Sequence, residues 1–156
     1  MPEPLSVADT LSELDFAGIR PREFAQLIKG LSAREFAEAL QGEVRLRALR
    51  EIFSWMERLF RPEAAGSLRA LIRWEVEGAD ATTVFETAIA DGHCVVSEGA
   101  SADEPRVTLT LADAEFLKLV SGNGNSVTMF VLRKIKISGD VGLAAGLTRL
   151  FDIPKA

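Results

Sequence analysis

The chain has 156 residues, of which 47% are apolar and 26% charged, and its formal net charge is -5; this composition is typical of one globular domain. The negative charge argues against nucleic-acid binding, which usually requires a basic excess. The single cysteine, Cys94, excludes an intramolecular disulfide framework.

The N-terminal third is predicted to be helical. Apolar residues recur with helical spacing over residues 24–31. Residues 32–35 (SARE) are typical of a capping box that opens a second short helix. A third, longer helix is expected over residues 49–60, where the apolar spacing lasts three turns, and Pro62 ends it.

Alternation with a period of two replaces helical spacing after residue 67. Ile72 and Trp74 share one face of the first such segment and Arg73 lies on the other, which indicates a half-buried strand. Asp91-Gly92 is a tight hairpin signal. Strands are therefore predicted over residues 67–76, 82–90, 93–97 and 106–111.

The last third returns to helices around one more strand. Asp113 and Asp140 are expected to cap the helices that follow them, and Gly122 is expected to stop the first of these. Ile135 and Ile137 should point inward from a strand. The predicted order is a helix after residue 113, a turn over 123–126, a helix over 127–132, a strand over 134–138 and a final helix over 140–151.

No catalytic group is evident. His93 and Cys94 are the only histidine and cysteine, and neighbouring strand residues point to opposite faces, so they do not converge as a nucleophile–base pair must. The acidic residues are scattered rather than grouped as metal ligands. The sequence therefore predicts a protein that is not an enzyme and has neither a metal nor a cofactor.

One basic cluster, formed by Arg133, Lys134 and Lys136, occurs in the C-terminal part. It is either a solvated surface or an anchor for a carboxylate or phosphate head group. The glycine-rich residues 122–126 lie between two predicted helices and lack the Lys-Ser/Thr of a phosphate-binding loop, so a turn is expected there.

The order of elements in the last third, with residues 108–124 (TLTLADAEFLKLVSGNG), 134–140 (KIKISGD) and 142–151 (GLAAGLTRLF), resembles the sterol carrier protein 2 (SCP2) family of lipid-binding domains. The resemblance covers about residues 43–156. Residues 27–40 (LIKGLSAREFAEAL) and 51–65 (EIFSWMERLFRPEAA) also look like the helical extension of some bacterial members, and residues 1–42 are assigned to a helical N-terminal extension. It implies an α+β fold with about five strands, covered on one face by helices, and an apolar tunnel between sheet and helices. Family members bind and transfer fatty acids, fatty acyl-CoA, sterols or other lipids.

Periodicity alone would assign the large apolar residues of the last third to an ordinary core. The resemblance implies instead that some of them line the tunnel. The implied lining consists of Ile72, Trp74 and Phe85 on strands, Phe116, Leu119 and Val120 on the helix after residue 113, Met129 and Phe130 on the next helix, and Leu143, Leu147 and Leu150 on the last.

The final helix is a candidate gate for the tunnel. Its apolar stripe needs a cover, yet Gly142 and Gly146 lie inside it, and each costs about 1 kcal/mol relative to alanine. Weak intrinsic stability suits an element that opens and recloses. The alternative is that both glycines permit close packing against the sheet.

The expected function is non-catalytic carriage of a long-chain lipid or acyl ligand. The alternative is an accessory subunit of a lipid- or isoprenoid-processing enzyme system. The turn at 123–125 lacks the family's usual basic residues, and the chain does not end in a peroxisomal signal; both favour a bacterial acyl-lipid binder over a peroxisomal sterol carrier. No apolar run approaches the ~20 residues of a membrane helix, and residues 1–6 lack the features of a secretory signal, so a cytoplasmic location is expected. A transient membrane contact, a protein partner and a homodimer stay open.

Overall fold

A computed structural model of the protein describes residues 42–78, 81–120 and 126–152. The helices expected over residues 24–31 and 32–40, the stop expected at Gly122 and residues 123–125 of the expected turn lie outside these residues, whereas Ser126, expected to close that turn, begins a helix. The elements are α4 (Gly42–Leu59), α5 (Pro62–Ala65), β1 (Ala70–Glu77), β2 (Thr82–Ala90), β3 (His93–Glu98), β4 (Val107–Ala112), α6 (Asp113–Val120), α7 (Ser126–Val131), β5 (Ile135–Gly139), α8 (Val141–Gly146) and the 3₁₀ helix η1 (Leu147–Leu150).

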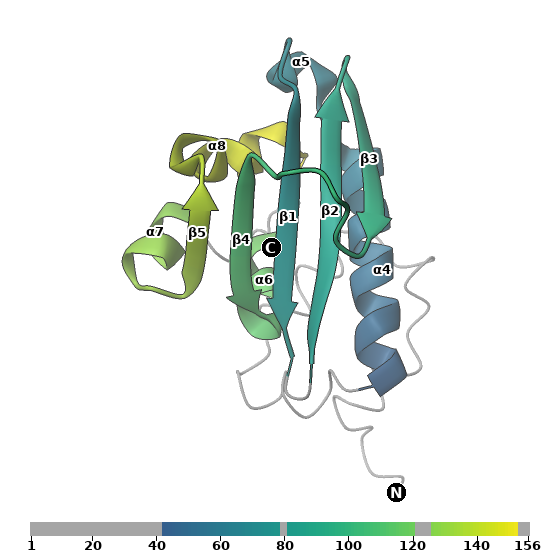
Figure 1. Ribbon diagram of the computed structural model, residues 1–156, viewed down its shortest axis with the longest axis vertical. Coiled ribbons are helices and arrows are strands. Elements are labelled where there is room, and N and C mark those ends of the chain that lie inside the picture. The colour runs from purple at the N-terminus through teal and green to yellow at the C-terminus, as the bar shows by residue number, and fades with distance from the viewer. Residues whose placement is uncertain (1–41, 79–80, 121–125, 153–156) are drawn as a thin grey trace, which may run out of the picture.

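The five strands form one mixed sheet in the order β3-β2-β1-β4-β5. β1 and β4 are parallel neighbours, and the other three pairs are antiparallel. The parallel pair needs a crossover, because a tight turn joins only antiparallel strands. The crossover is the segment over residues 99–106, which passes across the front of the sheet in Figure 1.

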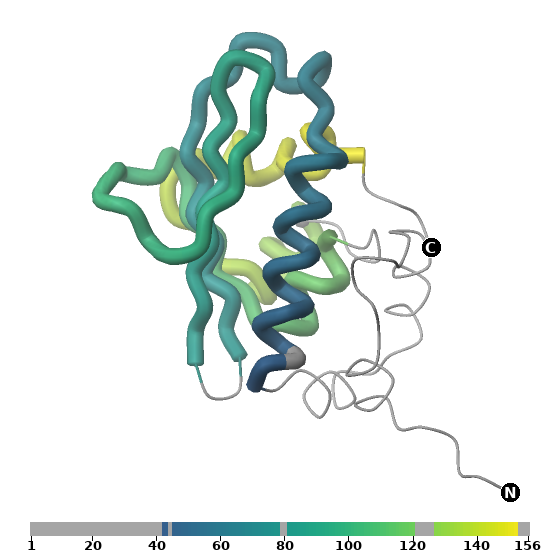
Figure 2. The backbone as a smooth tube through the Cα atoms, turned by 90° about the vertical axis from the view of Figure 1, so that its right-hand side faces the viewer, coloured from purple at the N-terminus to yellow at the C-terminus, as the bar shows by residue number. Residues whose placement is uncertain are grey.

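The two faces of the sheet are covered differently. α4, α6 and α8 pack on one face, and α7 lies beside β5 at the edge (Figures 1 and 2). The crossover segment lies on the opposite face, where Arg73 binds Glu86 and the carbonyls of Ser101 and Asp103. The predicted α+β architecture, with about five strands and helices on one face, is confirmed.

The β2–β3 hairpin follows the turn chemistry of its sequence. Asp91 and Gly92 have φ angles of 53° and 74°, and two consecutive left-handed residues define a type I′ turn, whose twist matches that of the strands. The predicted hairpin and its flanking strands are therefore confirmed.

The C-terminal helix differs from the expected continuous helix over residues 140–151. Asp140 caps α8 as predicted, accepting a hydrogen bond from the backbone N–H of Leu143 at 2.9 Å. The chain then tightens into η1 after Gly146. Phe151 is extended and forms an antiparallel bridge with Phe60. This pairing ends the helical segment at Leu150, one residue before the last apolar residue of the predicted stripe.

Candidate functional site: an apolar layer beneath the helices

The apolar layer between the sheet and the helices contains a cluster of four aromatic rings. The Phe53 ring from α4 stacks on Phe85 with centroids 4.2 Å apart and on Phe116 with centroids 5.1 Å apart. Trp74 from β1 meets both Phe53 and Phe116 edge to face. Alternation places Trp74 and Phe85 side by side on adjacent strands, so one sheet face and two helices build the cluster together.

Trp74 carries the polar group of this cluster. Its Nε1–H donates a hydrogen bond to the Thr87 hydroxyl at 3.1 Å, and both residues are buried. A buried indole N–H needs such a partner. The pairing satisfies the indole N–H of Trp74 within an otherwise apolar layer.

Most of the predicted lining residues lie in this layer. Val120 and Leu143 are half-buried, and Phe130 is 41% exposed. α7 turns Met129 inward and leaves Phe130 facing solvent, so a place for Phe130 in the lining would require α7 to move and stays a prediction. The other predicted lining residues are buried, and their role as the lining of a tunnel stays a prediction: Ile72, Trp74, Phe85, Phe116, Leu119, Met129, Leu147 and Leu150.

Phe53 is the central residue that the sequence-based lining omits. It is fully buried and contacts three of the other aromatic rings. Phe53 lies within the apolar spacing that predicts the helix over residues 49–60, but the resemblance implies a lining from strands and from the helices of the last third only. The apolar stripe of the helix predicted over residues 49–60 was the feature of the sequence that could have identified Phe53.

A partly buried ion pair ties the helices to the sheet at one end of the layer. Arg45 of α4 donates from Nε to both carboxylate oxygens of Asp113 at 2.9 and 3.1 Å, and also reaches the Thr83 hydroxyl and the Val76 carbonyl. A Cβ at residue 78 would lie 2.5 Å from Nε of Arg45, so glycine makes room for the guanidinium. Burial raises the pKa of Asp113, and the hydrogen bond and charge of Arg45 offset only part of this effect. Asp113, expected as a cap, thus links α6 to α4.

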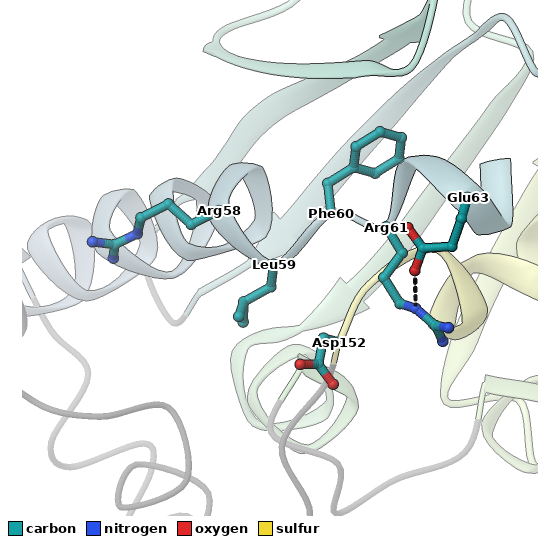
Figure 3. A pocket seen from close by; sticks show the side chains of 6 residues that line it. All are labelled: Arg58, Leu59, Phe60, Arg61, Glu63 and Asp152. Atoms are coloured by element: carbon teal, nitrogen blue, oxygen red, sulfur yellow. Dashed lines mark hydrogen bonds and ion pairs between the residues drawn. The ribbon is translucent and has the colours of Figure 1, made fainter. Parts of the chain in front are cut away.

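A separate open pocket of about 530 Å³ lies where α4 and α5 meet the C-terminal end of η1 (Figure 3). Its two arginines already have carboxylate partners, since Arg61 binds Glu63 at 3.0 Å and Arg58 lies 3.5 Å from Glu51. Charged side chains make up most of this lining, so the pocket does not suit an apolar chain. It is lined by Arg58, Leu59, Phe60, Arg61, Glu63 and Asp152.

His93 and Cys94 occupy the edge strand β3 and differ in exposure. His93 is exposed and Cys94 half-buried. Burial, with a smaller contribution from the negative charge of Glu57, raises the pKa of the Cys94 thiol to about 12. The thiol is therefore protonated near neutral pH, and the thiolate that nucleophilic chemistry needs is scarce.

The fold and its interior define a class: an α+β domain whose mixed sheet and helices enclose an apolar layer. A model of the SCP-2 sterol transfer family matches residues 56–152, more than half of the chain. The chain belongs to this family of lipid-binding domains. Within the described residues, no helix combines the length and apolar character needed to cross a membrane.

Relatives in other organisms contain similar sequence as a small part of longer chains. Sterol carrier protein 2 of Gallus gallus is 37% identical over 73 residues, which are 47% of this chain and 13% of that protein. Peroxisomal multifunctional enzyme A of Dictyostelium discoideum is 33% identical over 71 residues, which are 46% of this chain and 16% of that protein. The chain thus spans about a sixth or less of these relatives.

Solved structures share the fold at low sequence identity. Palmitated SCP2L2 from Aedes aegypti matches 67% of this chain and 95% of its own, with a TM-score of 0.51 and 21% identity. The inverting sec-alkylsulfatase Pisa1 from Pseudomonas sp. matches 94% of this chain and 30% of its own, with a TM-score of 0.61 and 15% identity. The ubiquinone synthesis protein UbiJ-SCP2 matches 69% of this chain and 91% of its own, with a TM-score of 0.51 and 16% identity.

Proposed function

We propose that this protein binds and carries an apolar ligand, a fatty acid, fatty acyl-CoA or sterol-like lipid, in a tunnel between the sheet and α6, α7, α8 and η1. The observation that carries the proposal is the buried apolar layer shared by these elements in a member of the SCP-2 sterol transfer family. The Aedes relative in its palmitated form supports an acyl ligand.

The proposed ligand would compete with contacts inside the protein. Phe116, Leu119 and Leu147 are each at most 3% exposed, so an acyl chain would enter by separating the helices from the sheet. Each CH₂ buried contributes about 0.8 kcal/mol. A long chain can therefore offset the loss of helix–sheet contacts, whereas a short one cannot.

The proposed role is non-catalytic. The protonated Cys94 thiol and its exposed neighbour His93 give no activated nucleophile on β3. The enzymes among the relatives are much longer than this chain, so their activities can reside in other parts. The cytoplasmic location expected from the sequence stays a prediction.

Displacement of a fluorescent fatty acid by unlabelled fatty acids of about 8 to 18 carbons tests the proposal, because affinity should rise with each buried CH₂. The increments should be at most about 0.8 kcal/mol per CH₂ and should end where the tunnel is full. A flat affinity series would contradict burial of the chain.

The two tryptophans test where the ligand lies. Trp74 belongs to the aromatic cluster, whereas Trp55 lies on α4 and is also buried. The Trp55→Phe variant should keep the change in tryptophan emission when fatty acid binds, and the matched Trp74→Phe variant should lose it. The reverse pattern would place the ligand elsewhere.

An accessory role in a lipid- or isoprenoid-processing enzyme system is the second candidate. It is favoured by the fold shared with the ubiquinone synthesis protein UbiJ-SCP2 and by relatives that contain the domain within larger proteins. In that case the apolar layer would hold the substrate of a partner enzyme. The fatty-acid displacement series described above tests this role as well. The accessory role also requires that the protein form a stable complex with an enzyme.

A further inference from the structure

The exposed apolar residues of the described chain gather at one edge of the molecule. Six large apolar residues are exposed in the described part of the chain. One of them, Val95, lies on β3, and the other five lie between residues 127 and 141. They belong to α7, to the turn after it and to the first residue of α8, and α7 contacts both β5 and α8. The five are Val127 (50% exposed), Phe130 (41%), Val131 (71%), Leu132 (59%) and Val141 (45%).

The same edge is basic although the chain is acidic. Residues 126–139 contain Arg133, Lys134 and Lys136 and no acidic residue, in a chain of net charge -5. All three cations are exposed. Two acidic groups flank the cluster: Glu115 lies 3.9 Å from Lys134, which leaves Arg133 and Lys136 without an acidic partner among the described residues, and Asp140 pairs with Arg106 at 3.0 Å. We call these five apolar and three basic residues the α7–β5 rim.

The turn at the centre of the rim has an arginine at a position where glycine is usual. α7 ends with hydrogen bonds from the N–H of Lys134 to the Met129 carbonyl and from the N–H of Arg133 to the Phe130 carbonyl. In this termination the residue in the left-handed conformation is usually glycine, but here it is Arg133, with φ of 61°. Glycine would adopt this conformation without the steric cost that a side chain adds, so the arginine side chain is kept at some expense in stability.

We propose that the α7–β5 rim docks on the surface of a bilayer that contains anionic phospholipids. Val131 and Leu132 would enter the boundary between head groups and acyl chains, while Arg133 and the two lysines remain with the phosphates. A second copy of the chain is disfavoured as the occupant, because a symmetric contact would bring two basic clusters together. Docking is a property of the outer surface and does not require the proposed lipid in the interior.

Co-sedimentation of the full chain with phosphatidylcholine vesicles, with and without phosphatidylserine, tests the proposal. Binding should appear with phosphatidylserine and weaken as salt is raised. Each cation near the membrane changes the partition coefficient about fivefold, so Lys134→Gln/Lys136→Gln should lower it about 25-fold. Val131→Ser/Leu132→Ser should lower it at least about tenfold through lost apolar burial.

Arg133→Gly separates docking from folding. It removes both the cation and the backbone strain, so the partition coefficient should fall about fivefold while the melting temperature stays equal or rises. The matched control is Arg50→Gln, which removes one exposed cation on α4 beside the opposite edge strand, β3; its binding should stay within about twofold of the parent.

Three outcomes would overturn the docking proposal. They are equal sedimentation with both vesicle types, rim variants that bind like the parent, and a concentration-dependent dimer that the rim variants dissociate. Fatty-acid displacement measured on the same variants keeps the two proposals apart. Lost vesicle binding with intact displacement defines the rim, and lost displacement with intact vesicle binding rejects only the interior ligand site.

Discussion

Glu86 shows at the residue scale how a buried charge holds a crossover in place. It is 1% exposed, and its carboxylate accepts hydrogen bonds from Arg73 at 2.8 Å and from the backbone N–H of Ser101 at 3.0 Å. Burial alone would raise the pKa of Glu86, but these bonds and the charge of Arg73 outweigh it and hold the pKa below its ordinary value. The carboxylate is therefore more stable ionised in the folded protein than in the unfolded chain.

The stability that Glu86 contributes is present above its unfolded pKa and is lost as pH falls through its lower folded pKa. Glu86→Gln should lower the free energy of unfolding by about 1–3 kcal/mol at neutral pH, and the difference should shrink as pH falls below the unfolded glutamate pKa of about 4.3. Urea denaturation over a pH series measures both effects. Glu98→Gln, in an exposed pair with Arg50, is the control and should cost less than about 1 kcal/mol; a difference for Glu86→Gln that does not vary with pH would contradict the assignment.

Phe116 is a second residue whose role depends on its neighbours. If Phe116 lined a tunnel, its truncation to alanine would lower the free energy of unfolding by less than the truncation of a core phenylalanine would. The ring is fully buried and contacts both Phe53 and Trp74, and this packing revises the expectation. Phe116→Ala should lower the free energy of unfolding by about 3–5 kcal/mol, measured by chemical denaturation without ligand. Ala114→Gly, on the half-buried part of the same helix, should cost only about 1 kcal/mol. A Phe116→Ala loss of that smaller size would indicate that the ring lines an open tunnel rather than a packed core.

At the element scale, α8 and η1 remain the predicted gate. A Cβ at residue 146 would meet no atom within 4 Å, and one at residue 142 would meet only Oδ1 of Asp140 at 3.4 Å. The glycines are therefore not needed for close packing against the sheet, which was the alternative explanation. Their effect is on the intrinsic stability of the helix.

Gly142→Ala/Gly146→Ala should raise stability by less than about 2 kcal/mol, because a glycine in a helix interior costs about 1 kcal/mol relative to alanine and these two lie near the ends of α8. If the helix opens by local unfolding, the variant should also release a fluorescent fatty acid more slowly. Thermal melts and stopped-flow release measure the two effects. Faster or unchanged release in a stabilised variant would show that α8 is not the gate.

At the scale of the whole molecule, native mass spectrometry separates the carrier from the accessory subunit. A carrier purified under gentle conditions should retain a bound mass in the range of a fatty acid or sterol, with one lipid for each chain. Protein denatured and refolded without lipid is the control and should lack that mass. An empty protein recovered in a stable complex with an enzyme would favour the accessory role.

Much of the fold follows from local patterns along the sequence. The alternation around Trp74, the Asp91-Gly92 turn and the Asp140 cap each depend on residues close together in the chain, and all three are confirmed. The resemblance in the last third led to the family that the comparison establishes. The proposed division into residues 1–42 and 43–156 stays a prediction, with α4 beginning at Gly42.

Tertiary structure decided what distant segments do to one another. Only the folded chain brings Arg45 to Asp113 and Phe53 to Phe116, because these pairs join elements far apart in sequence. The Phe60–Phe151 bridge ends the last helix early, and the packing of α7 turns Phe130 to solvent. Helical spacing shows that a face is apolar, but whether that face is covered depends on which neighbours fold against it.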